Sequence, residues 1–159
     1  MKLIGAFLVL AAALLFSTEA RRRAEKRLLL LEETLRFIER VRVDISCYLR
    51  PISEIPSGFC SDALSEAGFL SSFEKEGACE AYLKLEPLLS PSPEEKRALE
   101  RFFGALGKGY ADDQIKLIDE TLLEFTRLVS LERERVPKVK KLSLSLSFSG
   151  ALALIIFFL

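Results

Sequence analysis

The 159-residue chain contains no histidine and no tryptophan. Because histidine is the commonest general base and a frequent zinc ligand, its absence removes the usual catalytic triads and most zinc sites. The three cysteines, Cys47, Cys60 and Cys79, form no Cys-x-x-Cys pair. Such an odd, scattered set predicts reduced, buried thiols in a cytoplasmic compartment. The 23 basic residues balance the 23 acidic ones, which argues against a nucleic-acid-binding protein. The sequence therefore favours a non-enzymatic protein without cofactor or metal.

Apolar residues make up half of the chain, and they concentrate at its two ends. Residues 3–18 carry no charge, and neither do residues 142–159. At about 1.5 Å per residue the second run spans roughly 27 Å, close to a hydrocarbon core of about 30 Å, and the first spans roughly 24 Å. We therefore predict a transmembrane anchor at 1–20 and a transmembrane helix at 142–159. A cleaved signal peptide ending near Ala20 is the alternative for the first run, but the arginines that follow oppose export.

Basic residues border the inner end of both apolar runs. Such clusters stay on the cytoplasmic side of a membrane, so each one places residues 21–141 in the cytoplasm. Each charge near anionic lipid contributes about 1 kcal/mol, which makes anionic lipid an expected partner. The predicted membrane-interface residues are Arg21, Arg22, Arg23, Lys26, Arg27, Lys138, Lys140 and Lys141.

Small residues recur at helical spacing in the last apolar run. Ser143, Ser147, Gly150 and Ala151 are the predicted positions of close helix packing in the membrane. The equally supported alternative is that these serines are simply tolerated, because each can bond to its own helix backbone.

The segment between the anchors has the pattern of a helical bundle. Residues 20–50 contain neither glycine nor proline and repeat apolar residues at spacings of three and four, which predicts one long helix ending at Pro51. Residues 51–91 predict two or three short helices. Ser92 begins a capping box followed by a helix up to Gly107, and a last long helix starts near Asp112. The fold class is therefore all-α, a cytoplasmic bundle of about six helices whose first and last helices lie side by side.

Charge is segregated along this bundle, because residues 51–126 carry 15 acidic and only 7 basic residues. The stretch 51–91 could hold a groove for a partner. The glycines from Gly104 to Gly109 do not form a phosphate loop, since Gly109 follows Lys108 where serine or threonine is needed. Asp112 and Asp113 are interpreted as helix caps rather than as a metal pair.

The order of these features resembles the stage III sporulation protein AB family over nearly the whole chain. The resemblance rests on the opening Met1–Gly5 segment, the helix from Leu31 to Pro51, Leu106-Gly107 followed by Gln114, and Lys140-Lys141 before the last apolar run. The chain departs from the family pattern at Gly109-Tyr110, where Ser-Asp is usual, and at Ser147, where glycine is usual.

The resemblance implies a non-catalytic component of the channel that joins mother cell and forespore, on the mother-cell side of the membrane. It also implies a bundle similar to the platform domain of type II secretion systems. The implied partners are other proteins of the channel complex, including a cytoplasmic secretion-type ATPase and polytopic membrane subunits. Two alternatives remain: a secretion-platform or holin-like scaffold outside sporulation, and a membrane-bound enzyme that uses only the carboxylates of Asp112, Asp113 and Asp119.

Overall fold

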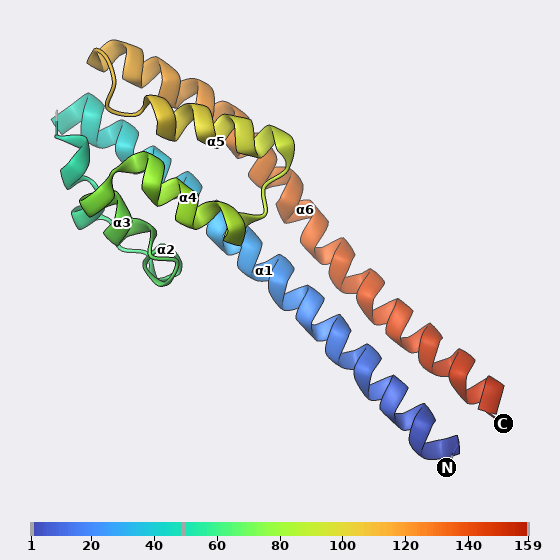
Figure 1. The fold of residues 1–159 in the computed structure, drawn as a ribbon. Helices are drawn as coiled ribbons and strands as arrows, with labels where there is room; N and C mark the ends of the chain where they lie inside the picture. Colours follow the sequence, from blue (N-terminus) through green and yellow to red (C-terminus); the bar gives the residue numbers. More distant parts are fainter. Residues whose placement is uncertain (1, 49, 159) are drawn as a thin grey trace. The chain divides into compact units, whose positions relative to one another are not determined.

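The computed structural model describes the backbone of residues 2–48 and 50–158. It describes the side chains of residues 15, 18–48, 50–139, 141, 142, 145, 149 and 150. The chain divides into a terminal unit, residues 1–28 and 131–159, and a central unit, residues 29–130. All secondary structure in the described backbone is helical (Figure 1). The elements are α1 (Lys2–Tyr48), η1 (Ile52–Glu54), η2 (Pro56–Gly58), α2 (Asp62–Glu66), α3 (Phe69–Glu76), α4 (Ala78–Leu89), α5 (Pro93–Ala105) and α6 (Ala111–Phe158). The predicted all-α class with about six helices is confirmed.

The first long helix ends as the sequence predicts, because Pro51 has no backbone N–H and restricts the residue before it. Helix α1 covers residues 2–48, which includes the predicted segment from residue 20 up to Tyr48. Its apolar stripe is buried at Leu31, Ile38, Val41 and Ile45, each at most 6% exposed. Tyr48, which continues the same spacing, is 61% exposed because the helix ends there.

Glycine and serine divide residues 51–91 into short helices. The Ser61 hydroxyl accepts a hydrogen bond from the Leu64 backbone N–H at 3.3 Å and begins α2. Gly77 lies between α3 and α4 with φ of 97°, a conformation that side-chain-bearing residues rarely adopt. The prediction of two or three short helices is therefore confirmed, with η1 and η2 as additional single turns.

The capping box that begins α5 is present. The Glu95 backbone N–H donates to the Ser92 hydroxyl at 3.3 Å, and the Ser92 N–H donates to the Glu95 carboxylate at 2.6 Å. Pro93 occupies the first helical position, where its missing N–H costs nothing. Helix α5 ends at Ala105, and Gly107 follows with φ of 83°.

The core of the central unit is rich in phenylalanine. The Phe37 ring of α1 lies edge-on to three other rings, with centroid distances of 5.4 Å to Phe59, 5.1 Å to Phe69 and 5.3 Å to Phe73. The Phe69 ring in turn meets Phe103 of α5 at 5.7 Å. Offset and edge-on pairs of this kind add to the burial of their apolar area. The phenylalanines are thus core residues, as their helical spacing predicts.

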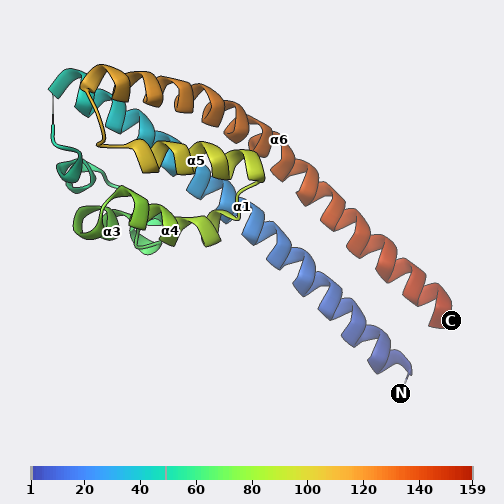
Figure 2. The ribbon, with the colours of Figure 1, turned by 45° about the horizontal axis from the view of Figure 1, so that its top comes forward.

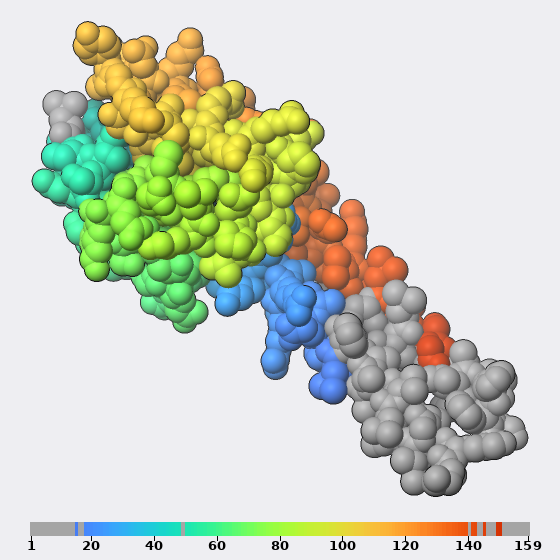
Figure 3. Space-filling model, viewed as in Figure 1, coloured from blue at the N-terminus to red at the C-terminus, as the bar shows by residue number. Residues whose placement is uncertain are grey.

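Helix α5 lies beside α4 (Figure 2). Its Arg101 side chain donates to Glu124 of α6 at 3.0 Å. In the space-filling view, α4 and α5 form much of the visible face of the central unit (Figure 3). The α6 stripe packs into the same core, with Ile118, Phe125 and Val129 buried.

The prediction of buried cysteines is wrong. All three cysteine side chains are free and exposed rather than buried. Cys47 lies near the end of α1, and Cys60 lies in the loop before α2. Cys79 lies in the first turn of α4, where its thiol donates to the Phe103 carbonyl at 3.7 Å. The apolar core is filled by leucine and phenylalanine instead, so the thiols are not needed for packing.

The predicted anchors at 1–20 and 142–159 fall mostly outside the described side chains. In the part of the chain whose side chains are described, no helix has a stretch long and apolar enough to cross a membrane.

Candidate functional site

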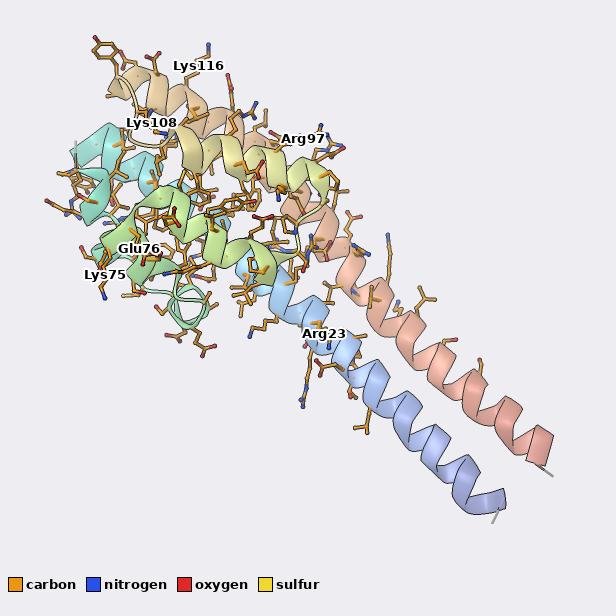
Figure 4. The ribbon with its side chains drawn as sticks, viewed as in Figure 1. Arg23, Lys75, Glu76, Arg97, Lys108 and Lys116 are labelled. Atoms are coloured by element: carbon orange, nitrogen blue, oxygen red, sulfur yellow. The ribbon has the colours of Figure 1, made fainter. Side chains whose placement is uncertain are left out.

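The N-terminal half of the predicted membrane interface lies on one stretch of α1 in the terminal unit. Arg22, Arg23 and Lys26 are exposed, and Arg21 is half-buried. The Arg23 side chain projects from the helix (Figure 4) and donates to the Glu19 carboxylate at 3.0 Å. Because this i,i+4 pair is open to solvent, it contributes little to stability.

Arg27 differs from its neighbours because its charge is already matched within the chain. Its guanidinium lies 2.6 Å from the Glu132 carboxylate of α6, in a close ion pair without hydrogen-bond alignment. Only 17% of the Arg27 side chain and 12% of the Glu132 side chain are exposed. Arg135 also approaches Glu132, at 3.6 Å. The structure therefore separates Arg27, an interhelical residue, from the exposed arginines of the same run.

The C-terminal half of the predicted interface is described in part. Lys138 and Lys141 are exposed on α6. The side chains of Lys140, Ser143, Ser147 and Ala151 lie outside the described residues, and Gly150 is exposed. The lipid contact and the helix packing proposed for these positions stay predictions.

A second long-range ion pair joins α1 to α6 within the central unit. The Arg42 Nε donates to Asp119 at 2.5 Å, and its second nitrogen lies 3.4 Å from the other carboxylate oxygen. The hydrogen bond from Arg42 lowers the pKa of Asp119 below its usual value. Both side chains are nearly half exposed, which limits the contribution of the pair to stability.

The loop between α5 and α6 is held by the side-chain amide of Gln114. Its oxygen accepts from the Gly107 N–H at 3.0 Å, while its nitrogen donates to the carbonyls of Ala105 at 3.1 Å and Lys108 at 2.6 Å. Gln114 is only 5% exposed. The glycine-rich segment is thus a helix terminus and a turn, as predicted, and the amide satisfies backbone groups that would otherwise need water.

The three carboxylates considered for catalysis do not form a buried acidic site, because all three side chains are exposed. Asp112 and Asp113 are exposed in the first turn of α6, where negative charge favours the helix. Helix α6 begins at Ala111, so they lie just inside the helix rather than at its cap. Asp119 is paired with Arg42, as described above. Among the described residues there is no cluster of acidic or cysteine side chains that could hold a metal ion.

The stretch 51–91 does contribute to a surface hollow. A volume of about 350 Å³ lies between α1 and the start of α2, lined by Leu29, Glu33, Arg36, Cys60 and the first residues of the short helix. One oxygen of Glu33 is buried there without a hydrogen-bond partner, while the other pairs with Arg36 at 2.6 Å. Sequence periodicity places Glu33 and Arg36 on α1, but it gives no sign that the loop after η2 reaches them.

The family model of stage III sporulation protein AB matches residues 2–159 of the chain. No curated protein and no solved structure matches the chain.

Proposed function

The chain belongs to the stage III sporulation protein AB family and has a role in sporulation, and from this membership we propose that it is a platform component of the channel between mother cell and forespore. In this role it is non-catalytic, and it supports the assembly of other channel proteins at the membrane. The observation that carries the proposal is the extent of the family match, which includes both apolar ends as well as the helical bundle.

The proposed topology has an anchor at residues 1–20, a cytoplasmic bundle at 21–141 and a transmembrane helix at 142–159. The exposed side chains of Arg22, Lys26, Lys138 and Lys141 support it, because they are free to meet anionic headgroups on the cytoplasmic side. Arg27 is not part of this lipid-facing set, since Glu132 already matches its charge. In a spore-forming cell the bundle then faces the mother-cell cytoplasm.

The proposed partners are the cytoplasmic secretion-type ATPase and the polytopic membrane subunits of the same channel complex. The bundle presents many carboxylates, and its core is closely packed around the phenylalanine cluster. A closely packed body has low compressibility, so it can position partners or transmit force without deforming. We propose mechanical coupling of this kind as its physical role.

The alternative of a membrane-bound carboxylate enzyme has less support. It requires a deeply buried acid with a raised pKa beside a cavity. Asp112 and Asp113 are exposed, and the hydrogen bond from Arg42 lowers the pKa of Asp119 instead of raising it.

Deletion of the gene in a spore-forming host tests the role, with forespore development scored by microscopy and heat-resistant spore counts. We expect arrest after engulfment, and restoration by a wild-type copy. A strain that completes forespore development normally would remove the sporulation role, and a secretion defect in that strain would instead favour a scaffold outside sporulation.

Protease added to intact cells tests the topology separately. We expect the central bundle to resist digestion until the membrane is opened. Digestion in intact cells, or removal of the first twenty residues from the mature protein, would contradict the proposed orientation.

A further inference from the structure

Two guanidinium groups of the central unit converge on one glycine. Arg40 lies on α1, Arg50 follows the end of α1, and Gly58 ends η2. A Cβ atom placed on Gly58 would lie 3.7 Å from an Arg50 nitrogen and 3.8 Å from an Arg40 nitrogen. Both arginines therefore bring a guanidinium nitrogen near the same point, and Gly58 has no side chain to occupy it.

The charges at this point do not cancel. The Arg40 Nε donates to the Asp44 carboxylate at 2.8 Å, and the Asp44 side chain is fully buried. Arg50 lies over the Tyr48 ring, with its guanidinium carbon 5.5 Å from the ring centroid. No carboxylate of the described residues forms an ion pair with Arg50. One of the two positive charges at Gly58 is therefore uncompensated.

The same point is accessible from outside the molecule. Arg50 and Gly58 are exposed, and the Tyr48 ring is 61% exposed. Tyrosine and arginine are enriched among the residues that contribute most to binding at protein interfaces. Since the amide N–H of Gly58 already donates to Ile55, the donors available to a ligand come from the two guanidinium groups.

We propose that Arg40 and Arg50, converging on Gly58, bind a carboxylate from an acidic segment of a partner protein. A carboxylate fits the planar fork of a guanidinium and can accept two parallel hydrogen bonds from it. Its single negative charge matches the one uncompensated positive charge, whereas a phosphate group carries up to two. The charge balance thus favours an acidic peptide over a phosphate-bearing ligand such as a lipid headgroup.

Binding of a labelled hexaglutamate peptide to the full-length protein in neutral detergent micelles tests the proposal, with fluorescence anisotropy as the readout at low salt. We expect saturable binding that Arg50→Gln weakens by at least about fivefold, because a charge-assisted hydrogen bond is lost. Gly58→Leu should weaken binding similarly, since it fills the open point while leaving both arginines in place. Gly58 is exposed, so this change does not disturb the core.

Arg97→Gln is the matched control. Arg97 is exposed on α5 (Figure 4), so this substitution removes the same charge at another place on the protein. Circular dichroism melts should show that all three variants fold. Equal weakening by Arg97→Gln, or no saturable binding, would overturn the proposal. Displacement of the peptide by equimolar inorganic phosphate would also overturn it, in favour of a phosphate-bearing ligand. The assay involves no sporulating cell, so its failure leaves the proposed function unaffected.

Discussion

At the scale of single residues, Tyr82 places a polar group without a hydrogen-bond partner in the core of the central unit. The Tyr82 ring stacks on Phe103 with centroids 5.4 Å apart, and its hydroxyl is buried without a hydrogen bond. Burial raises the pKa of this phenol above its ordinary value, and the nearby carboxylates of Glu86 and Glu100 add to the rise. The ring stabilises the core while the hydroxyl opposes that gain.

Tyr82→Phe should therefore stabilise the protein, by about 1 kcal/mol, because it removes an unsatisfied polar atom and keeps the stacked ring. Thermal unfolding of the full chain in detergent, followed by circular dichroism, measures the change. Tyr110→Phe is the control, since Tyr110 is 83% exposed and its hydroxyl is hydrated in either state. A lower melting temperature for Tyr82→Phe would show that the hydroxyl does have a partner.

At the scale of elements, the connection from α5 to α6 depends on a single side chain. Gln114 uses three of its hydrogen-bonding positions on the backbone of the loop that precedes it. A side chain on the following helix thus fixes the turn that leads into that helix.

Gln114→Leu should destabilise the protein by about 2 kcal/mol, because it leaves the Gly107 N–H and the Lys108 carbonyl without their partner and removes one of the two donors to the Ala105 carbonyl. The measurement is again the unfolding transition, together with hydrogen exchange of the Gly107 amide. Lys116→Ala, an exposed change two residues further along α6, serves as the reference and should have little effect. An unchanged exchange rate at Gly107 in Gln114→Leu would contradict the assigned hydrogen bond.

The pair between Arg42 and Asp119 gives a pH-dependent link from α1 to α6. Since the folded-state pKa of Asp119 is lowered, the stabilisation is present above the unfolded pKa of about 4 and is lost as pH falls through the folded value. Asp119→Asn should lower the melting temperature slightly at pH 7 and by less at pH 2, where Asp119 is increasingly protonated. High salt should shrink the effect at pH 7, because both side chains are nearly half exposed. A difference that persists unchanged at pH 2 would assign the effect to something other than charge.

At the scale of the whole molecule, an ion pair that is largely hidden from water joins the two segments of the terminal unit. Arg27 and Glu132 are far apart in sequence, and both belong to the terminal unit. Removing one partner of a shielded pair leaves the other charge with a desolvation cost that the pair no longer offsets.

Arg27→Glu alone should destabilise the protein by about 2 kcal/mol, while the double exchange Arg27→Glu with Glu132→Arg should recover a large part of that loss. Arg22→Glu is the matched control, because Arg22 is exposed on the same stretch of α1. Unfolding measurements on the four proteins form a double-mutant cycle. Equal losses from Arg27→Glu and Arg22→Glu would mean that the pair has no special role.

The sequence by itself determined the helices and much of their buried surface. Apolar spacing predicted the stripes on α1 and α6, Ser92 and Glu95 predicted the capping box, and Pro51 predicted where α1 ends. These features depend on neighbours within four residues, so they can be derived from a single chain. The exposed cysteines were missed, because residue type gives only an average tendency toward burial.

Only the tertiary structure decided how charged and polar side chains are paired. Arg27 and Arg22 are indistinguishable in the basic run, yet one meets Glu132 and the other meets solvent. Likewise, the convergence of Arg40 and Arg50 on Gly58 depends on where the loop after η1 returns to α1. Hydrogen bonds and ion pairs act over a few ångströms in space, so their partners are fixed by packing between helices and not by spacing along the chain.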